Sequence, residues 1–192
     1  GPDKIYASTS QAVFSYNKQS GETETLTKVN VLSDVGISFL RYHKPLSTLI
    51  IGYENGNIDL LQNKQLTNIA DIKRKTLSAE KSIHDIDFIN NYAILSTGFG
   101  IVILDIERQE IKYTYYIGDL GSYVNVYSSE FDGQYIYAAT EEGILKGDYL
   151  NDNLSDFNNW INITDISTED SLPQLNGGGF NSIAIFNDKI YT

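Results

Sequence analysis

The sequence predicts an all-β fold, a β-propeller of four-stranded antiparallel blades of about 44 residues each, because two markers recur with one period. Short apolar segments rich in Tyr, Ile and Thr begin at residues 5, 49, 93, 136 and 190, with spacings of 44, 44, 43 and 54. A small residue and a second apolar run follow each complete segment, at Ala12, Gly56, Gly100 and Gly143, with spacings of 44, 44 and 43. Such a period is typical of WD40-like propeller blades.

Each repeat is expected to hold four strands, A to D, with the two markers in strands B and C. In three repeats strand A runs into a hairpin turn, at Asn90-Asn91, Asp132-Gly133 or Asn187-Asp188. The segments are too short, and too rich in Tyr, Ile, Thr and Gly, to be the helices of a solenoid. The expected strands are 5–9, 13–14 and 23–29; 37–42, 49–53, 58–60 and 66–72; 83–88, 93–97, 101–104 and 111–117; 126–131, 136–140, 144–145 and 160–164; and 180–186 and 190–192.

The domain organisation follows from the phase of the repeat. Residues 1–2, Gly1-Pro2, look like the remnant of an expression tag, and residues 3–192 form a partial propeller in which about four to five blades are represented. It holds strands B to D of one blade, three full blades and the start of a further one. One alternative is a small ring in which the last strand A pairs with the first blade, but we expect further blades to follow in the natural protein. Exposed blade edges would then favour pairing between copies in a homo-oligomer.

Composition bounds the function. With 41% hydrophobic and 20% charged residues the chain is globular, and its 14 Tyr and 8 Phe favour strands. A net charge of −11 disfavours nucleic acid as a partner. The absence of Cys excludes disulfides, thiolate nucleophiles and Cys-ligated zinc. No apolar run is long enough for a transmembrane helix.

Several stretches together resemble the N-terminal propeller region of the PorZ family of type IX secretion system components. They are 26–38 (LTKVNVLSDVGIS), 49–60 (LIIGYENGNIDL), 72–75 (IKRK), 98–111 (GFGIVILDIERQEI) and 135–140 (YIYAAT). The likeness is weakest in the insertion at 151–179. The Leu32-Ser33-Asp34 stretch also resembles the broader two-component regulator propeller repeat.

The resemblance implies a secreted protein with two propellers and a C-terminal β-sandwich, on the outer-membrane surface of a Bacteroidetes-type Gram-negative bacterium. It implies membership of an attachment complex with the sortase PorU and the proteins PorV and PorQ. It also implies a non-enzymatic role as a scaffold that binds anionic lipopolysaccharide and delivers it to the sortase. The family offers no catalytic residues to carry over, and no cofactor or metal is expected.

Candidate binding residues cluster on one expected face of the propeller, where D-to-A and B-to-C connections meet. Lys73, Arg74 and Lys75 form the one basic cluster of an acidic chain, and three cations there would suit phosphates or an acidic partner. Phe99 in a B-to-C turn is a candidate aromatic contact. Glu54 and Asn55, in the preceding B-to-C turn, would share that face. The alternative is a solvated basic loop, with Phe99 packed between blades.

Other motifs have structural interpretations. His84-Asp85 suggests a catalytic pair, but we expect both residues to be structural. The oxygen-rich run Asn151–Asp156 lacks the Gly and Glu of an EF-hand loop and is interpreted as a polar surface insertion. Gly177-Gly178-Gly179 lacks a following Lys and is interpreted as a flexible approach to strand A. The aromatic run Tyr113–Tyr116 is expected to pack across blades in an outer strand rather than to stack on sugars.

Two other functions remain open. A periplasmic sensor propeller of a hybrid two-component regulator would bind an oligosaccharide, although such propellers usually carry a Trp in strand B and this chain has its single Trp at 160. A lyase-type or glycosidase-type propeller would need converging acidic groups or histidines. Strands A offer only His84, Asp85, Asp87 and Glu130.

Overall fold

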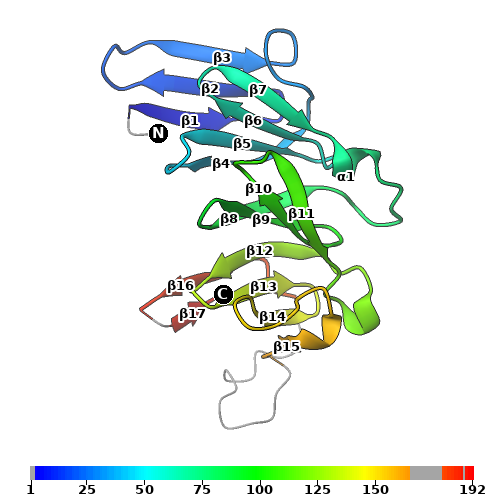
Figure 1. Ribbon diagram of the computed structural model, residues 1–192. Coiled ribbons are helices and arrows are strands. Elements are labelled where there is room, and N and C mark those ends of the chain that lie inside the picture. The colour runs from blue at the N-terminus through cyan, green and yellow to red at the C-terminus, as the bar shows by residue number, and fades with distance from the viewer. Residues whose placement is uncertain (1–2, 165–178, 188) are drawn as a thin grey trace.

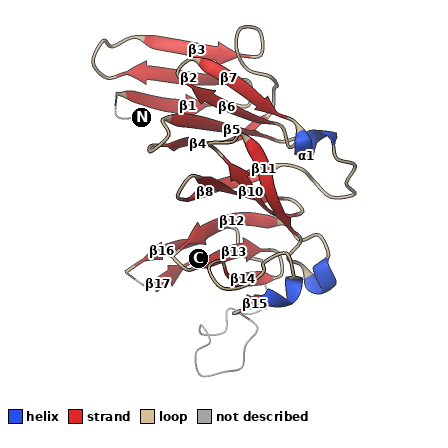
Figure 2. Ribbon diagram, viewed as in Figure 1, coloured by secondary structure: helices blue, strands red, loops and turns tan. Residues whose placement is uncertain are grey.

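The computed structural model describes residues 3–164, 179–187 and 189–192, and it confirms a partial β-propeller (Figures 1 and 2). Five antiparallel sheets lie side by side in chain order: one of three strands, three of four, and one of two. The first holds β1 (Lys4–Ser8), β2 (Ala12–Asn17) and β3 (Thr23–Thr27). The second holds β4 (Ile37–His43), β5 (Thr48–Tyr53), β6 (Ile58–Gln62) and β7 (Gln65–Ile69), and is followed by helix α1 (Asp71–Arg74).

The remaining blades repeat this order. The third holds β8 (Ile83–Ile89), β9 (Tyr92–Thr97), β10 (Gly100–Asp105) and β11 (Glu110–Tyr115). The fourth holds β12 (Val126–Phe131), β13 (Tyr135–Thr140), β14 (Gly143–Asp148) and β15 (Trp160–Asn162), and the fifth β16 (Ala184–Phe186) and β17 (Lys189–Tyr191). Short 3-10 turns lie at Asp119–Gly121 and Phe157–Asn159.

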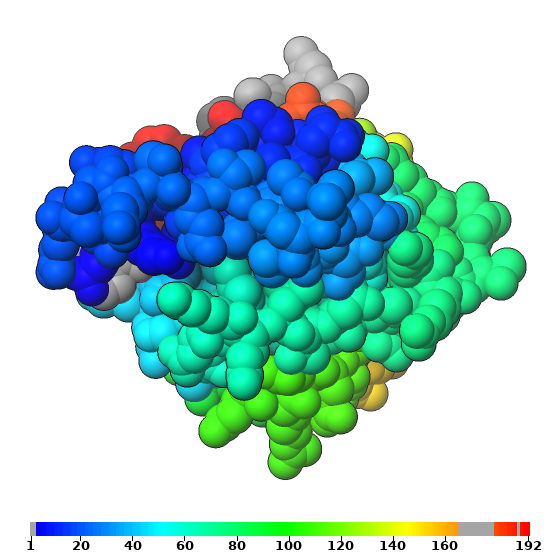
Figure 3. Space-filling view, turned by 90° about the horizontal axis from the view of Figure 1, so that it is seen from above, coloured from blue at the N-terminus to red at the C-terminus, as the bar shows by residue number. Residues whose placement is uncertain are grey.

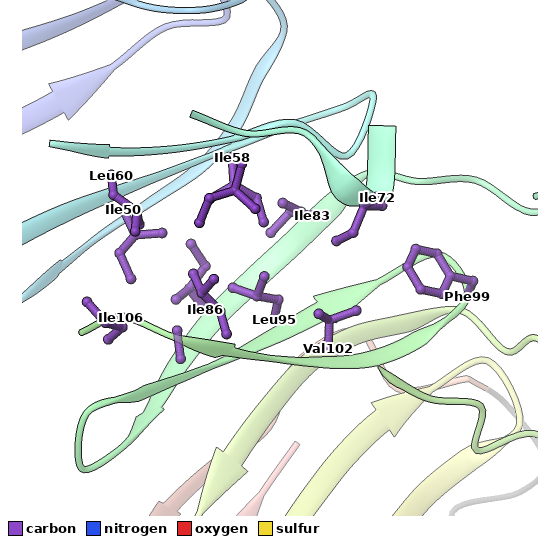
Figure 4. Packing of buried hydrophobic residues seen from close by; sticks show 13 residues of the cluster. Ile50, Ile58, Leu60, Ile72, Ile83, Ile86, Leu95, Phe99, Val102 and Ile106 are labelled. Carbon is purple, nitrogen blue, oxygen red and sulfur yellow. The ribbon is translucent and has the colours of Figure 1, made fainter. Parts of the chain in front are cut away.

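The cores lie between blades. Strand β5 is buried along its whole length because blades cover both faces of its sheet, so its sequence is continuously apolar rather than alternating. Figure 4 shows the core between the second and third blades, where Ile50, Ile58 and Leu60 meet Ile86 and Leu95. Equivalent clusters join the first blade to the second and the third to the fourth. Figure 3 looks down on the N-terminal blade, which covers part of the blades behind it.

The turn before strand C requires glycine, as expected from the repeat. Gly100 has φ 135°, and a Cβ there would lie 2.2 Å from the carbonyl oxygen of Tyr115. Gly143 has φ 132° in the same position of the next blade. In both blades the threonine that ends strand B, Thr97 or Thr140, donates its hydroxyl to the glycine carbonyl at 2.8 Å.

Hydrogen bonds from side chains to backbone join successive strands A, which lie next to each other along the inner side of the arc. Ser38 Oγ donates to the carbonyl of Ile83 at 2.7 Å, and Arg41 Nε donates to that of Ile86 at 2.8 Å. One blade on, His84 Nδ1 lies 2.8 Å from the carbonyl oxygen of Val126. Partners are separated by 42 to 45 residues, which is one repeat.

Some strand bounds differ from the sequence-based expectations. The strand expected at 66–72 ends at Ile69, because the chain turns into α1, whose Ile72 is buried against Gly56. The strand expected at 180–186 is paired only from Ala184. Among the described strands β16 pairs with β17 and β1 with β2, so no sheet joins the first and last blades here. The proposed tag remnant at residues 1–2 lies outside the described residues.

Candidate functional site

The expected shared face exists around helix α1. We call it the α1 face and define it by Asp34, Asn55, Lys73, Arg74 and Lys75. Asp34 lies in the connection from β3 to β4, Asn55 in the turn from β5 to β6, and the three cations on α1 and at its C-terminal end. D-to-A and B-to-C connections therefore meet on one side of the propeller.

Asp34 is the centre of the α1 face. Its carboxylate, on a residue 5% exposed, accepts hydrogen bonds from Lys73 Nζ at 2.5 Å, Asn55 Nδ2 at 2.8 Å and Lys28 Nζ at 3.1 Å. Burial alone would raise the pKa of Asp34. The hydrogen bonds from Lys73, Asn55 and Lys28 outweigh burial and hold that pKa well below its usual range. Lys73 thus has a structural partner.

A second buried carboxylate lies beneath Asp34. Asp59 is fully buried and accepts hydrogen bonds from the Tyr53 hydroxyl at 2.7 Å, the Ser33 amide at 2.8 Å and Asn68 Nδ2 at 2.8 Å. Burial, and then the hydrogen bond to Asp59, raise the pKa of Tyr53 far above its usual value. Buried polar groups are tolerated when they are paired in this way. This network fixes the two connections that carry Asp34 and Asn55.

The other cations differ from Lys73. Lys75 Nζ contacts the hydroxyl of Tyr116 at 2.5 Å and lies 5.3 Å from the centroid of that ring. Arg74 is exposed, and its guanidinium contacts no other described residue. The basic cluster predicted from sequence therefore contains one unpaired guanidinium, one cation next to an aromatic ring and one exposed lysine paired with the buried carboxylate of Asp34.

Of the two alternatives stated for Phe99, a contact in an exposed turn or packing between blades, the structure shows the packing. Phe99 is 1% exposed and packs in the core between the second and third blades, with its ring centroid 6.4 Å from that of Tyr116 (Figure 4). The cause is the tight turn at Gly100, which brings the side chain back onto the core. Glu54 is exposed as expected, and its amide donates to the carbonyl of Gly36 at 2.8 Å.

The acidic residues of strands A serve the joints between blades. Asp85 accepts from Ser128 Oγ at 2.8 Å, and Asp87 accepts from the Phe131 amide at 3.1 Å. Burial raises the pKa of Asp87 and that of Glu130, and the neighbouring Asp87 and Asp85 raise that of Glu130 further. Across the described ranges, no group of three or more Asp, Glu or His side chains could hold a metal ion. His84 and Asp85 each have a partner on the next blade, the carbonyl of Val126 and the hydroxyl of Ser128.

The structure describes the remaining sequence motifs in full or in part. In the run Asn151–Asp156, Leu154 is buried and its carbonyl accepts a hydrogen bond from Trp160 Nε1 at 3.0 Å, which anchors the insertion. Of the triple glycine, only Gly179 is described, and a Cβ there would lie 2.8 Å from Glu141 Cα. In the run Tyr113–Tyr116, Tyr115 packs on Trp160 of the next blade at 6.2 Å between ring centroids.

Sequence reasoning missed the residues that organise the α1 face. Asp34 was noted only as part of the Leu32-Ser33-Asp34 stretch, with no role assigned to it, and nothing local marks Asp59. The signal that the sequence does offer is the position of each residue within the repeat of about 44 residues. Asp59 falls inside the apolar strand C, where a carboxylate must be paired if it is buried.

The repeated blades and their inter-blade cores define the class of this protein, a β-propeller. The family model of the N-terminal β-propeller domain of PorZ, a component of the type IX secretion system, matches residues 5–161. The chain belongs to this family.

Solved structures agree. PorZ of Porphyromonas gingivalis, described as an essential bacterial surface component of the type IX secretion system, is 27% identical, with a TM-score of 0.73 over 83% of this chain. The extracellular domain of BT4673 from B. thetaiotaomicron, described as a one component system, is 14% identical, with a TM-score of 0.72 over 98% of this chain and 24% of its own. Yeast Sqt1 (Saccharomyces cerevisiae) is 14% identical, with a TM-score of 0.59 over 80% of this chain and 44% of its own. The last two show the fold alone.

The match to PorZ of P. gingivalis covers 21% of that protein, so the chain spans about a fifth of its length. No curated protein sequence matches the chain. Within the described ranges, no helix has both the length and the apolar character to cross a membrane.

Proposed function

We propose that the chain is a non-enzymatic propeller module of a type IX secretion attachment complex at the outer-membrane surface. In this role it binds anionic lipopolysaccharide and helps to present it to the sortase PorU, in company with PorV and PorQ. Family membership and the description of the P. gingivalis relative as a surface component support the location.

The single observation that carries the binding role is the state of Arg74. An exposed guanidinium without a partner in the described part of the chain stands next to Lys75, on a molecule of net charge −11. A planar guanidinium can donate two parallel hydrogen bonds to a phosphate or carboxylate. The network around Asp34 and Asp59 fixes the connections next to α1, and Lys73 ties α1 to Asp34, so the backbone that carries Arg74 is held at a defined place on the face.

The test is binding of the full-length protein to immobilised anionic lipopolysaccharide, measured by surface plasmon resonance. We expect the double variant Arg74→Ala/Lys75→Ala to weaken binding about tenfold, since charge-assisted hydrogen bonds are lost. The matched control is Arg108→Ala, which removes an equally exposed arginine in the turn between β10 and β11. Equal affinity of the double variant and the control would exclude the α1 face, and no saturable binding at all would reject the lipopolysaccharide role.

The competing function is that of a sensor propeller, which the likeness to the BT4673 domain favours only through the fold. The two proposals differ in their partner. A scaffold should be recovered with PorU, PorV and PorQ when the full-length protein is isolated from the membrane, whereas a sensor should not. Recovery without these three proteins would favour the sensor.

A further inference from the structure

A groove lies between the first and second blades, away from the α1 face. One wall is a row of directly opposite residues across the first sheet, in which Tyr6 pairs with Ser15 and Ser15 with Glu24. The facing wall is Tyr42 and Leu61 of the second blade. The hollow has a volume of about 310 Å³. We call it the inter-blade groove.

The groove extends along the first sheet. A second hollow of about 500 Å³ shares Lys4, Ser15, Glu24 and Lys64 with it and continues toward Asn17. Each of the two volumes lies in the range of sites for organic ligands, about 300 to 1,000 Å³, and exceeds what one small ion fills. The groove opens beside Ser47 and Lys64, in the A-to-B and C-to-D turns of the second blade. These turns lie at the opposite strand ends from the α1 face.

Hydrogen-bonding groups in the groove have no protein partner. The hydroxyls of Tyr6, Tyr42 and Ser15, and the side chains of Asn63 and Lys64, make no hydrogen bond to any described residue. Ser15 is 4% exposed and lines the hollow, Tyr6 and Tyr42 are half-buried, and Asn63 and Lys64 are exposed at its mouth. Polar groups that line a hollow and have no protein partner are available to hydrogen-bond a polar ligand.

The apolar residues at the base of the groove and its two tyrosine rings indicate which class of ligand would fit. The rings of Tyr6 and Tyr42 are close to parallel, with centroids 5.8 Å apart and 21° between planes. Leu26, Val31 and Leu61 line the base. Apolar and aromatic surface beside many hydroxyl donors and acceptors suits a molecule with both CH faces and hydroxyl edges, which is the character of a sugar ring.

Charge selects a neutral sugar. The groove and its extension carry Lys4 and Lys64 against Glu22 and Glu24, and Lys4 Nζ lies 3.5 Å from Glu24. The two positive and two negative side chains give the walls no net charge, so they offer no net attraction to an acidic ligand. We infer that the inter-blade groove is a binding site for a short neutral oligosaccharide. This site is independent of the anion-binding role proposed for the α1 face.

The test is calorimetric titration of the full-length protein with neutral tetrasaccharides. The panel holds α-linked and β-linked forms of glucose, galactose, mannose and N-acetylglucosamine, and a hyaluronan tetrasaccharide serves as the acidic comparison. We expect saturable binding of at least one neutral probe, tighter than that of hyaluronan. Failure of every neutral probe to bind, or preference for hyaluronan, would overturn the inference.

Variants place the site. Tyr6→Phe/Tyr42→Phe removes two hydroxyls while keeping both rings, and it should weaken binding of the neutral probe about tenfold. Tyr113→Phe, the same change at an exposed tyrosine elsewhere, should leave binding unchanged. Binding that survives the double variant would reject this groove. Arg74→Ala/Lys75→Ala should leave the neutral probe unaffected, so failure of either proposal is distinguishable from failure of the other.

Discussion

At the scale of single residues, paired charges define the α1 face. Lys73, Asn55 and Lys28 surround the carboxylate of Asp34, and the ionised form is favoured strongly enough to overcome burial. A carboxyl whose folded-state pKa is depressed adds stability above its unfolded pKa of about 4, and this contribution is lost as the pH falls. The contribution of Asp34 to the free energy of unfolding therefore depends on pH.

We predict that Asp34→Asn lowers the free energy of unfolding at pH 7 and flattens its decline between pH 5 and pH 3. The reason is that Lys28 and Lys73 donate to different oxygens of Asp34, and in asparagine an NH2 group, which cannot accept, replaces one of these oxygens. The amide also carries no charge to be titrated. Urea unfolding curves across this range measure the effect. Asp152→Asn, at an exposed carboxylate, is the control and should follow the parent curve. Parallel pH profiles for Asp34→Asn and the parent would contradict the prediction.

Gly56 offers a second prediction at this scale. It has φ 79°, and a Cβ there would lie 2.5 Å from Ile72 Cγ2, so Gly56→Ala should displace α1 and cost about 2 kcal/mol. Gly133 has φ 108°, and no atom lies within 4 Å of a Cβ added there. Gly133→Ala therefore measures the cost of backbone strain without a steric contact. Chemical denaturation should find Gly133→Ala milder, and equal losses would show that the contact with Ile72 is unimportant.

At the scale of elements, strands A hold the blades together by polar contacts at the inner side of the arc. Asp85 accepts from Ser128 Oγ at 2.8 Å and from the Ser129 amide at 3.4 Å, across the joint between the third and fourth blades. Both residues are buried, so the interaction is only weakly screened by solvent.

A double-mutant cycle with Asp85→Ala and Ser128→Ala should therefore show coupling of about 0.5 to 3 kcal/mol. Unfolding free energies of the parent, the two single variants and the double variant give this value. Additive losses would mean that the contact between these two side chains contributes nothing measurable to the joint.

The strands were predictable from sequence because each blade repeats the same local pattern, with Gly100 and Gly143 at equivalent turns. The state of individual side chains was not. The sequence left Phe99 open between an exposed contact and packing between blades, and the structure buries it. Lys73 was grouped with Arg74 and Lys75 as one basic cluster, but its partner Asp34 lies 39 residues away, a separation that no local pattern encodes. Such pairings depend on the packing of blades.

At the scale of the whole molecule, the protection of backbone amides from hydrogen exchange should differ between the inner blades and the first blade. Strands β5, β9 and β13 are paired on both sides and buried between blades, whereas β1 pairs only with β2 among the described strands. We predict that amides of β5, β9 and β13 exchange with deuterium much more slowly than the amides of β1. Hydrogen exchange followed by mass spectrometry measures this in the 192-residue chain. Uniform protection would indicate that the edge of β1 is covered, for example by a second copy.

The joints between strands A have an evolutionary consequence. In the bonds from Ser38, Arg41 and His84, the partner atom on the following blade is a main-chain carbonyl oxygen, which every amino acid supplies. A blade can therefore drift in sequence, or be duplicated, without losing its ability to receive its neighbour. At these contacts only the side chain on the preceding blade, such as that of Ser38 or Arg41, is constrained. Such one-sided dependence would let propellers gain or exchange blades while the surface loops diverge toward new partners.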